Sequence, residues 1–413
     1  MRNVIRDPIH GYIEIDELAI AILDTVEMQR LRRIRQLGFS YLVYPGANHT
    51  RFEHSLGTYH LMNVLLEKLG VAKEEEKELL VASLVHDIGH GPYSHVTEPL
   101  LKKITGKSHE DIEDLFFVQE KNKVAESTAT TIAAVLEEHR LDRRRILEYI
   151  KGEKTESGSE RDLSKILNGE IDVDKMDYLV RDSYYTGVAY GVVDNIRLIQ
   201  GLDFFKGNLV ITEKGILPAE YLLFSRFLMY PTVYGHHTSR IAQLMLLKAL
   251  EYFISESGSE DYALALRRMD DSEISIALRN ANGYPGEMMK RINERRLFKR
   301  AVYTGVNELE EGVIAQLSEE KQRRAVEAEI IGRAGVDEKY VIFDFQGAKE
   351  EVLKESTAKV LFRDEQTVRS LGDVSTLVSM LSRVFRENYN VGVYTLEKYR
   401  EEVKKAAKGV LWR

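Results

Sequence analysis

The stretch LLVASLVHDIGHGPYSH, residues 79–95, begins as a buried helix and then departs from that pattern. Its opening residues are mostly apolar, as on a helix that faces the core. His86 and Asp87 nevertheless stand side by side in this run, and His90 and His95 follow. Because burial of unpaired polar groups is costly, the pattern indicates that these side chains share a partner.

The histidines of the chain are concentrated around this stretch. Seven of the eleven lie between positions 49 and 109, whereas merely hydrogen-bonded histidines would be scattered. Neighbouring side chains on a helix point about 100° apart, so His86 and Asp87 can reach one ion from two sides. An ion bound by nitrogen and oxygen usually needs about four to six ligands. Further ligands must therefore come from other parts of the chain.

Two other segments offer such ligands. RFEHSLG places His54 at the start of a predicted helix, and GEIDVDKMDYLVRD (169–182) carries aspartates around Lys175. The aspartates are Asp172, Asp174, Asp177 and Asp182. So many acids in a short segment do not suit a core face, although a solvated acidic helix would also explain them. The residues alone leave open which aspartate joins His54.

The composition limits the class of protein. The chain has 413 residues, 44% of them hydrophobic, which suffices for one large core with smaller satellites. It has no cysteine, which excludes disulfides and thiolate metal sites. No run approaches the roughly 18 apolar residues of a membrane span, and the N-terminus lacks a signal-peptide pattern. These features predict a cytoplasmic protein without a membrane partner, and the net charge of −8 argues against binding of duplex nucleic acid.

Hydrophobic periodicity predicts a mainly α fold. Apolar residues recur at helical spacing over 18–37 and over 55–70, where Gly70 would cap the second helix. Polar stretches at 151–162 and 255–261 predict surface loops.

Shorter alternating segments predict two β-hairpins. One is DPIHGYIEI near the N-terminus, and the other spans 202–218 with Gly207 and Asn208 at its turn. Strand-like segments after about residue 340 alternate with a helix. We therefore expect a helical core at 1–250, a helical extension at 251–335 and a small α/β appendage at 336–413.

The segments around the candidate ligands resemble one protein family. The order His54, His86–Asp87 and a later aspartate is similar to the H…HD…D signature of the HD-domain metal-dependent phosphohydrolases. More specific are DPIHG, QRLRRIRQLG, YPGANHTRFEHSLGTYH, LVHDIGHGPYSH and DVDKMDYLVRD, in this order. They look like the deoxynucleoside triphosphate triphosphohydrolases, the branch with bacterial dGTPases and the vertebrate SAM-and-HD-domain dNTPase. The resemblance covers residues 1–240 and implies an HD-type helical core.

The resemblance implies hydrolysis of dNTPs at the α-phosphate, which releases deoxynucleoside and inorganic triphosphate. The metal ligands would be His54, His86, Asp87 and Asp174. This donor set has no sulfur and suits a divalent transition metal such as Fe, Mn, Co, Ni or Zn. In some relatives Mg²⁺ also contacts the substrate phosphates. A metal serves such a reaction as a Lewis acid and as a source of hydroxide near neutral pH.

The resemblance also implies roles for other residues. His95 would be the general acid for the leaving nucleoside, which suits the pKa range of histidine, and Glu98 would orient it. His90 and His109 would line the phosphate side. The substrate-binding positions would be Gln36, Leu37, Arg51, Lys175, Tyr178, Asp182, Arg226 and Tyr234.

Within that set the cations Arg51, Lys175 and Arg226 would bind phosphates. Gln36 and Leu37 would meet the sugar at its 3′ edge, and a tyrosine ring under C2′, contributed by Tyr178 beside Asp182, would exclude ribose. The chain departs from the vertebrate relative at Tyr230, which replaces a triphosphate-binding histidine, and at Gly235, which replaces a glutamine beside the base. The base preference is therefore not predicted.

A second nucleotide site is implied at positions where the vertebrate relative reads guanine, which makes GTP or dGTP a candidate activator. Its residues would be Val4, Asp24, Gln29 and Arg32. Relatives form this site between subunits, so a homo-oligomer, dimer or tetramer, is implied. As an alternative, Asp24, Gln29 and Arg32 are ordinary polar residues of a helix face, and Asn3 and Arg6 differ from the relatives' phosphate-contacting residues.

Two other functions stay open. A nucleotide phosphomonoesterase or a cyclic-nucleotide phosphodiesterase would share the H…HD…D signature, although RFEHSLG and DVDKMDY favour the triphosphohydrolase. A non-catalytic nucleotide sensor or nucleic-acid-binding scaffold is disfavoured because every metal position and His95 are intact. The sequence indicates neither the native metal nor the role of residues 340–413.

Overall fold

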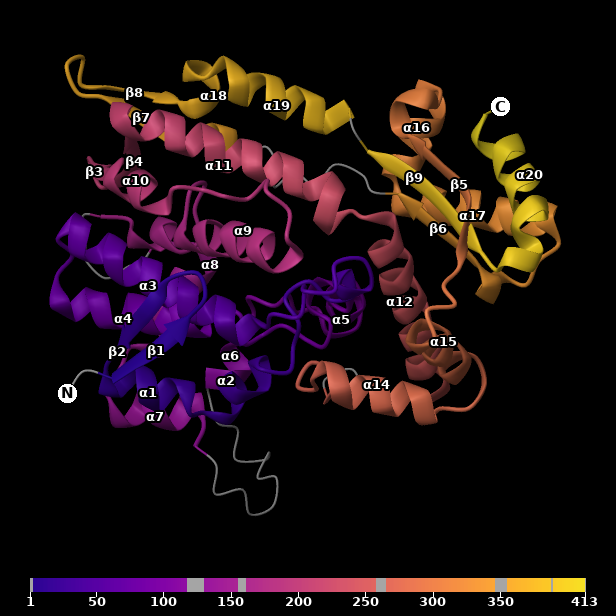
Figure 1. The fold of residues 1–413 in the computed structure, drawn as a ribbon, viewed down its shortest axis with the longest axis horizontal. Helices are drawn as coiled ribbons and strands as arrows, with labels where there is room; N and C mark the ends of the chain where they lie inside the picture. The colour runs from indigo at the N-terminus through magenta and orange to yellow at the C-terminus, as the bar shows by residue number, and fades with distance from the viewer. Residues whose placement is uncertain are drawn as a thin grey trace.

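The computed structural model describes residues 3–116, 130–154, 161–257, 265–345, 355–387 and 389–412. Within these residues the chain is mainly α, as predicted (Figure 1). Parts of the two predicted polar loops, 155–160 and 258–261, lie outside the described residues. Among the described helices, none is long and apolar enough to cross a membrane.

The centre of the fold is a group of helices that carries the candidate ligands. It consists of α3 (Arg51–Leu69), α4 (Lys73–Val85), α8 (Arg143–Lys151) and α9 (Val173–Thr186), which lie together on one side of the molecule (Figure 1). A capping box formed by Thr50 and Glu53 begins α3. The left-handed Gly70 ends it, which confirms the predicted cap.

The other helices of the first half surround this group, and those of the second half extend from it. In chain order they are α1 (Glu17–Leu23), α2 (Val26–Leu31), α5 (Glu98–Thr105), α6 (Glu113–Phe116), α7 (Ile132–Glu138), α10 (Asn195–Gln200), α11 (Ile216–Met229), α12 (His237–Ser257), α14 (Asp271–Asn280), α15 (Gly283–Asn293), α16 (Glu311–Ser318), α17 (Glu320–Ala334), α18 (Leu371–Val374), α19 (Thr376–Glu387) and α20 (Arg400–Leu411).

Two helix predictions were wrong in their extent. The predicted helix over 18–37 is broken between α1 and α2, where the buried Thr25 hydroxyl donates to the Ile22 carbonyl at 2.7 Å. Such a side-chain bond to the backbone competes with helix continuation. The helix that opens the 79–95 stretch ends at Val85, so His86 caps α4 and Asp87 lies in the turn that follows.

The strands form three small sheets. β1 (Asn3–Asp7) and β2 (Gly11–Ile15) make the predicted N-terminal hairpin, with Ile5 opposite Ile13. β3 (Leu202–Phe205) and β4 (Asn208–Thr212) make the second hairpin. Its turn is formed by Lys206 and Gly207, one residue earlier than predicted, because both adopt the positive φ that a tight hairpin turn requires.

The C-terminal segments are divided between two sheets. β7 (Lys359–Phe362) and β8 (Thr367–Ser370) extend the β3–β4 hairpin, with β7 parallel to β4. β5 (Lys299–Gly305), β9 (Asn390–Thr395) and β6 (Val341–Phe345) form a separate antiparallel sheet beside α17 and α20 (Figure 1). The strand pairing thus links residues after 355 directly to the helical region. The division into 1–250, 251–335 and 336–413 stays a prediction.

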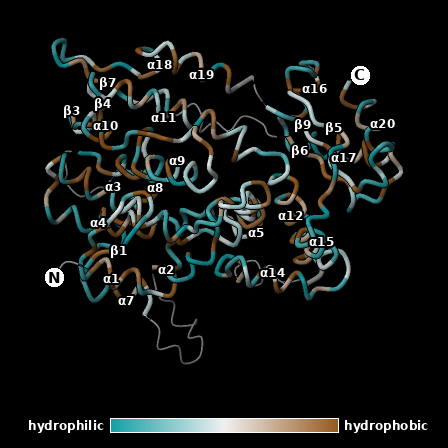
Figure 2. The backbone as a smooth tube through the Cα atoms, in the orientation of Figure 1, coloured by the Kyte–Doolittle hydropathy of each residue, from teal (hydrophilic) through white to brown (hydrophobic). Residues whose placement is uncertain are grey.

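Hydrophobic and hydrophilic residues alternate along most helices (Figure 2), as expected for helices with one buried face. The largest buried cluster joins α3, α4 and α9 and includes Val360 and Leu371 from the C-terminal segments. A second cluster centres on α12, α14 and α15, and a third fills the β5–β9–β6 sheet with α17 and α20. The polar residues of the 79–95 stretch lie at the edge of the first cluster.

Candidate active site

His54 and His86 point their Nε2 atoms toward each other at the edge of the largest buried cluster. His54 on α3 points Nδ1 at the Asp177 carboxylate, 2.8 Å away, and His86 points Nδ1 at the Ser83 carbonyl, also 2.8 Å away. Because these oxygens accept hydrogen bonds, each Nδ1 donates a proton to its oxygen, and Nε2 is the nitrogen of each ring that is left to bind an ion. The two Nε2 atoms are only 3.3 Å apart, so an ion between them would satisfy both.

Two carboxylates complete a donor set of the right size for an ion. Asp174 Oδ1 lies 2.8 Å from His54 Nε2 and 3.7 Å from His86 Nε2. Asp87 places Oδ1 3.5 Å from His86 Nε2 and Oδ2 3.8 Å from His54 Nε2. Ligands that bind one ion at about 2.0–2.2 Å lie about 3.0 Å apart at octahedral angles and about 3.5 Å apart at tetrahedral angles. These distances suit a divalent metal held by His54, His86 and Asp87, and Asp174 Oδ1 lies beside both histidines.

The electrostatics of this donor set favour a positive charge. Burial alone would lower the pKa of His54, but its hydrogen bonds with Asp174 and Asp177 outweigh burial and raise that pKa to about 10. Burial likewise would raise the pKa of Asp174, yet its contacts with His54 and His86 hold it well below the usual value. A proton thus binds tightly where an ion would bind, and a metal would displace it.

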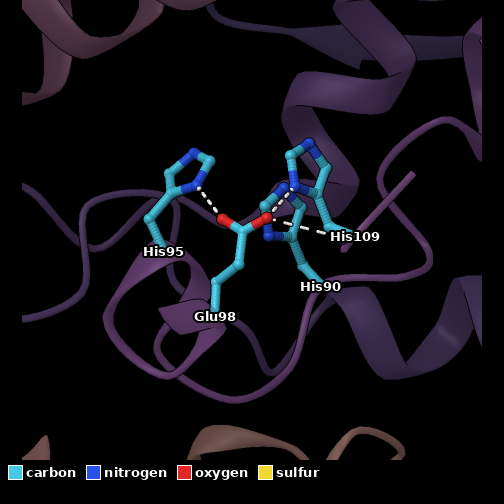
Figure 3. A group of neighbouring side chains, drawn as sticks. All are labelled: His90, His95, Glu98 and His109. Atoms are coloured by element: carbon cyan, nitrogen blue, oxygen red, sulfur yellow. Dashed lines mark hydrogen bonds and ion pairs between the residues drawn. The ribbon is translucent and has the colours of Figure 1, made fainter. Parts of the chain in front are cut away.

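A second group of side chains lies next to the donor set. Glu98, the first residue of α5, sits between His95 and His109 and turns one carboxylate oxygen toward each ring (Figure 3). Its Oε2 accepts from His95 Nδ1 at 2.9 Å, and its Oε1 accepts from His109 Nδ1. Burial would raise the pKa of Glu98, but these two histidines hold it well below its usual value. Glu98 is therefore an anionic acceptor.

His90 connects this group to the donor set. Its Nε2 lies 3.3 Å from Asp87 Oδ1, and its ring stacks on His109 at 4.1 Å between centroids. The stacking needs Gly89, because a Cβ there would lie 2.0 Å from the His109 carbonyl oxygen. The four predicted catalytic residues are thus neighbours, and of them His95 is the most exposed, at 62%.

The backbone before His95 is strained. Tyr93 and Ser94 both have φ of 57°, which is costly for residues with a Cβ. Tyr93 N–H donates to Asp271 at 2.6 Å, and the Ser94 hydroxyl accepts from Arg51 Nε at 2.7 Å. These contacts hold Tyr93 and Ser94 in place and so fix the direction in which the His95 side chain projects from the backbone.

A cavity of about 150 Å³ connects both groups. Of the predicted substrate residues, Gln36, Arg51, Lys175 and Tyr178 line it, together with the metal ligands, His90, His95 and His109. Gln36 Oε1 is buried there without a hydrogen-bond partner, and so it is available to a ligand hydroxyl. A larger cavity of about 390 Å³ lies between α17 and β6. Its lining of Glu, Arg, Asp and Phe includes none of the predicted residues.

The cations in the cavity already have carboxylate partners. Arg51 Nη1 donates to Asp87 at 2.6 Å, and Lys175 Nζ donates to Asp172 at 2.6 Å. Asp172 also caps the N-terminus of α9, where its side chain accepts from the Lys175 backbone N–H. These pairs orient the cations toward the cavity while their charges are balanced.

The other predicted substrate residues, Leu37, Asp182, Arg226 and Tyr234, do not line this cavity. Asp182 lies behind it and accepts from His49 Nε2 at 2.7 Å and from the Tyr234 hydroxyl at 2.9 Å. The Tyr234 ring lies 6.4 Å from that of Tyr178. Asp182 and Tyr234 therefore back the tyrosine wall of the cavity.

Three of the four predicted residues of the second nucleotide site lie close together. Arg32 Nε donates to Gln29 Oε1 at 3.0 Å, and the guanidinium carbon lies 3.5 Å from the centre of the Phe52 ring. Burial lowers the pKa of Arg32, and the nearby Asp24 carboxylate opposes that shift. Val4 is 52% exposed on β1. The role of these residues stays a prediction.

Sequence reasoning missed three partners. His10 and Asp177 stand in quoted motifs, but no local pattern indicates that they contact each other or that Asp177 contacts His54. Glu355 comes from the divergent C-terminal part, is 2% exposed and pairs with Arg226. No sequence signal marks it. Glu355 pairs with the Arg226 guanidinium, to which the resemblance assigns the binding of a phosphate.

Comparisons with known proteins match this chain to HD-type families. A family model described as HD domain matches residues 51–182, and one described as HD associated region matches residues 193–412. An uncharacterized protein of Methanocaldococcus jannaschii is 34% identical over 97% of this chain and 80% of its own length. A crystal structure of a hypothetical protein from Aquifex aeolicus superposes with a TM-score of 0.77 at 28% identity, covering 98% of this chain and 100% of that chain.

A more distant relative has a printed activity. The deoxynucleoside triphosphate triphosphohydrolase SAMHD1 of Homo sapiens is 33% identical over 66% of this chain. The match spans 48% of that human protein, so its remaining half has no counterpart in the comparison.

Proposed function

From the premise that this chain belongs to the HD-domain phosphohydrolase superfamily, in the branch of the dNTP triphosphohydrolases, we propose that it hydrolyses deoxynucleoside triphosphates to deoxynucleoside and inorganic triphosphate. One observation carries the proposal: a group of side chains that could hold a metal ion lines the same cavity as the exposed His95, which is hydrogen-bonded to Glu98. HD domains bind divalent metals, and such a pair can transfer a proton beside one.

His54, His86, Asp87 and Asp174 would hold the metal, which supplies Lewis acidity and an activated water when bound. Arg51 and Lys175 bind the phosphate oxygens and orient the α-phosphate. His95 donates a proton to the 5′ oxygen as the bond from the α-phosphorus to that oxygen breaks and the bond to the water oxygen forms, and the proton that the water loses passes to the solvent. Glu98 holds His95 by its Nδ1, so that Nε2 is left for the transfer. Mg²⁺ on the phosphates would complete their neutralisation.

The products of hydrolysis test the proposal. We expect protein loaded with Mn²⁺, Co²⁺ or Fe²⁺ to convert each dNTP to deoxynucleoside and triphosphate in equal amounts, measured by chromatography of both products. Orthophosphate with dNDP, or pyrophosphate with dNMP, would contradict it. Turnover of nucleoside monophosphates or cyclic nucleotides alone would favour the phosphomonoesterase or phosphodiesterase alternative.

Replacing Tyr178 by alanine is expected to narrow the preference for dNTPs over NTPs by about tenfold or more. Burial raises the pKa of Tyr178 to about 12, so its ring packs as a neutral wall. A ribose hydroxyl pressed against such a wall loses its partners, which costs about 1–3 kcal/mol. The ratio of kcat/KM for matched dNTP and NTP pairs measures the effect. Tyr178→Phe keeps the ring and should keep the ratio, and an equal loss in both variants would exclude the wall.

We also propose that GTP or dGTP binds at Val4, Asp24, Gln29 and Arg32 between subunits of a homo-oligomer. Support comes from the proximity of Arg32 to Gln29 and Asp24 and from the position of its guanidinium over the Phe52 ring. The product assay repeated with GTP, alongside sedimentation, examines this proposal, because an activator should raise both the rate and the mass of the oligomer.

A further inference from the structure

We propose that Asp177, clamped by the N-terminal hairpin through His10, is the positioning residue that orients the metal ligand His54. The inference depends on metal binding at the candidate site and not on which phosphate ester is hydrolysed. It assigns a role to DPIHG, a motif that the proposed reaction itself does not use.

Within the described residues, the Asp177 carboxylate accepts four hydrogen bonds, from His10, His54 and Arg181. Oδ1 accepts from His10 Nε2 at 2.7 Å and from Arg181 Nη2 at 2.9 Å. Oδ2 accepts from His54 Nδ1 at 2.8 Å and from Arg181 Nε at 2.8 Å. The Asp177 side chain is fully buried, so water does not compete for these positions. The carboxylate therefore cannot rotate without breaking several bonds.

The hairpin turn is itself held rigidly against α9. Asp7 Oδ1 accepts from the backbone N–H of Ile9 and of His10, at 2.8 Å each, which fixes the shape of the turn. Asp7 Oδ2 accepts from Arg181 Nη1 at 2.8 Å. Arg181 thus bridges the two aspartates, and the turn delivers His10 to Asp177 in one orientation.

This arrangement decides which nitrogen of His54 is free for a metal. With Asp177 accepting from Nδ1, that nitrogen keeps its proton, and Nε2 is the nitrogen that faces Asp174 and His86 and is left for a metal. The other polar group near Nδ1 is the Thr58 hydroxyl, at the longer distance of 3.5 Å. Loss of the carboxylate would let the ring rotate or move its proton to Nε2, which removes the ligand.

Where α3 packs on α9, Gly57 leaves room for the Asp177 and Arg181 side chains. A Cβ on Gly57 would lie 1.9 Å from Asp177 Oδ1 and 2.4 Å from Arg181 Nη2. Gly57 stands one turn after His54 on α3, so the same helix face supplies both the ligand and the space for its orienting acid.

Asp177→Asn is the sharpest test, because both oxygens of the carboxylate only accept. An amide NH₂ at the Oδ2 position would face His54 Nδ1 and Arg181 Nε, and at the Oδ1 position it would face His10 Nε2 and Arg181 Nη2. We expect Co²⁺ affinity, measured by competition with a chelator, to fall by about 10–100-fold. The visible absorption of bound Co²⁺ should also change, because one ligand is displaced.

His10 is tested by a pair of variants. His10→Ala removes the clamp and should weaken Co²⁺ binding, whereas His10→Gln can place an amide N–H near the former Nε2 and should restore it. This rescue also keeps the inference testable if Asp177→Asn does not fold. Co²⁺ binding in His10→Ala equal to wild type would overturn the role of the hairpin.

Asp344→Asn is the matched control. Asp344 is a buried carboxylate that accepts from both Arg240 Nε and Nη2, but it lies in β6, away from the candidate site. It should lower the melting temperature without changing Co²⁺ affinity. Folded Asp177→Asn protein with wild-type Co²⁺ affinity and spectrum would overturn the inference. These readouts need no substrate, so their failure is distinct from failure of the proposed reaction.

Discussion

The double variant His86→Ala/Asp87→Ala is expected to contain no bound metal after purification and to have lost turnover by about 10³-fold or more. The two side chains supply half of the donor set, and the remaining His54 and Asp174 form a two-ligand site that holds divalent ions weakly. A metal bound by the complete donor set stabilises the charge that develops in the transition state by several kcal/mol. Losing that metal therefore explains the expected loss of turnover. Elemental analysis measures the metal, and release of triphosphate from dNTP measures the turnover.

Thermal stability gives an independent readout. A metal that binds only the folded state stabilises it according to its concentration and affinity. Added Co²⁺ should therefore raise the melting temperature of the wild-type protein and leave that of the double variant unchanged. His236→Ala/His237→Ala is a control with another adjacent pair, at the start of α12, and should keep its metal. Equal metal content in wild type and in His86→Ala/Asp87→Ala would remove these residues from the ligand set.

The sequence predicted those parts of the fold that depend on local signals. Gly70 ends α3 because a left-handed residue is needed there, and both hairpins form where short alternating segments meet turn residues. The break between α1 and α2 was missed because it depends on one buried side-chain bond from Thr25. The parallel pairing of β4 with β7 joins segments far apart in the chain, and no periodicity reports such a contact.

The same division holds at the candidate site. Residue types and spacing identified the histidines and aspartates as candidates. The sequence alone could not distinguish the four aspartates around Lys175, because they are chemically equivalent. The structure separates them by what each contacts: Asp172 caps α9, Asp174 faces His54 Nε2, Asp177 faces His54 Nδ1, and Asp182 holds Tyr234. Glu355 could not be predicted, because its contact with Arg226 follows from tertiary packing alone.

His95→Ala is expected to lower kcat by about 10²–10⁴-fold while the metal content stays at the wild-type level. His95 is 62% exposed and makes a hydrogen bond to Glu98, and Glu98 keeps its contact with His109 when His95 is removed. The loss should therefore be in the proton transfer and not in folding. The descending, high-pH limb of the wild-type rate profile should flatten in the variant, because the acid that it reports is gone. His139→Ala, another exposed histidine at the end of α7, should retain wild-type kcat.

Glu98→Gln distinguishes a general acid from an ordinary contact residue. Glutamine keeps an acceptor oxygen for His95 Nδ1 but removes the charge that stabilises the protonated ring, so kcat should fall less than in His95→Ala. If Glu98 acts through His95, adding Glu98→Gln to His95→Ala should cost almost nothing more, because residues that work as a unit are not additive. Two fully additive losses would mean that Glu98 acts independently of His95, through His109. A His95→Ala enzyme within threefold of wild type would exclude His95 from the proton transfer and leave the metal site to act without it.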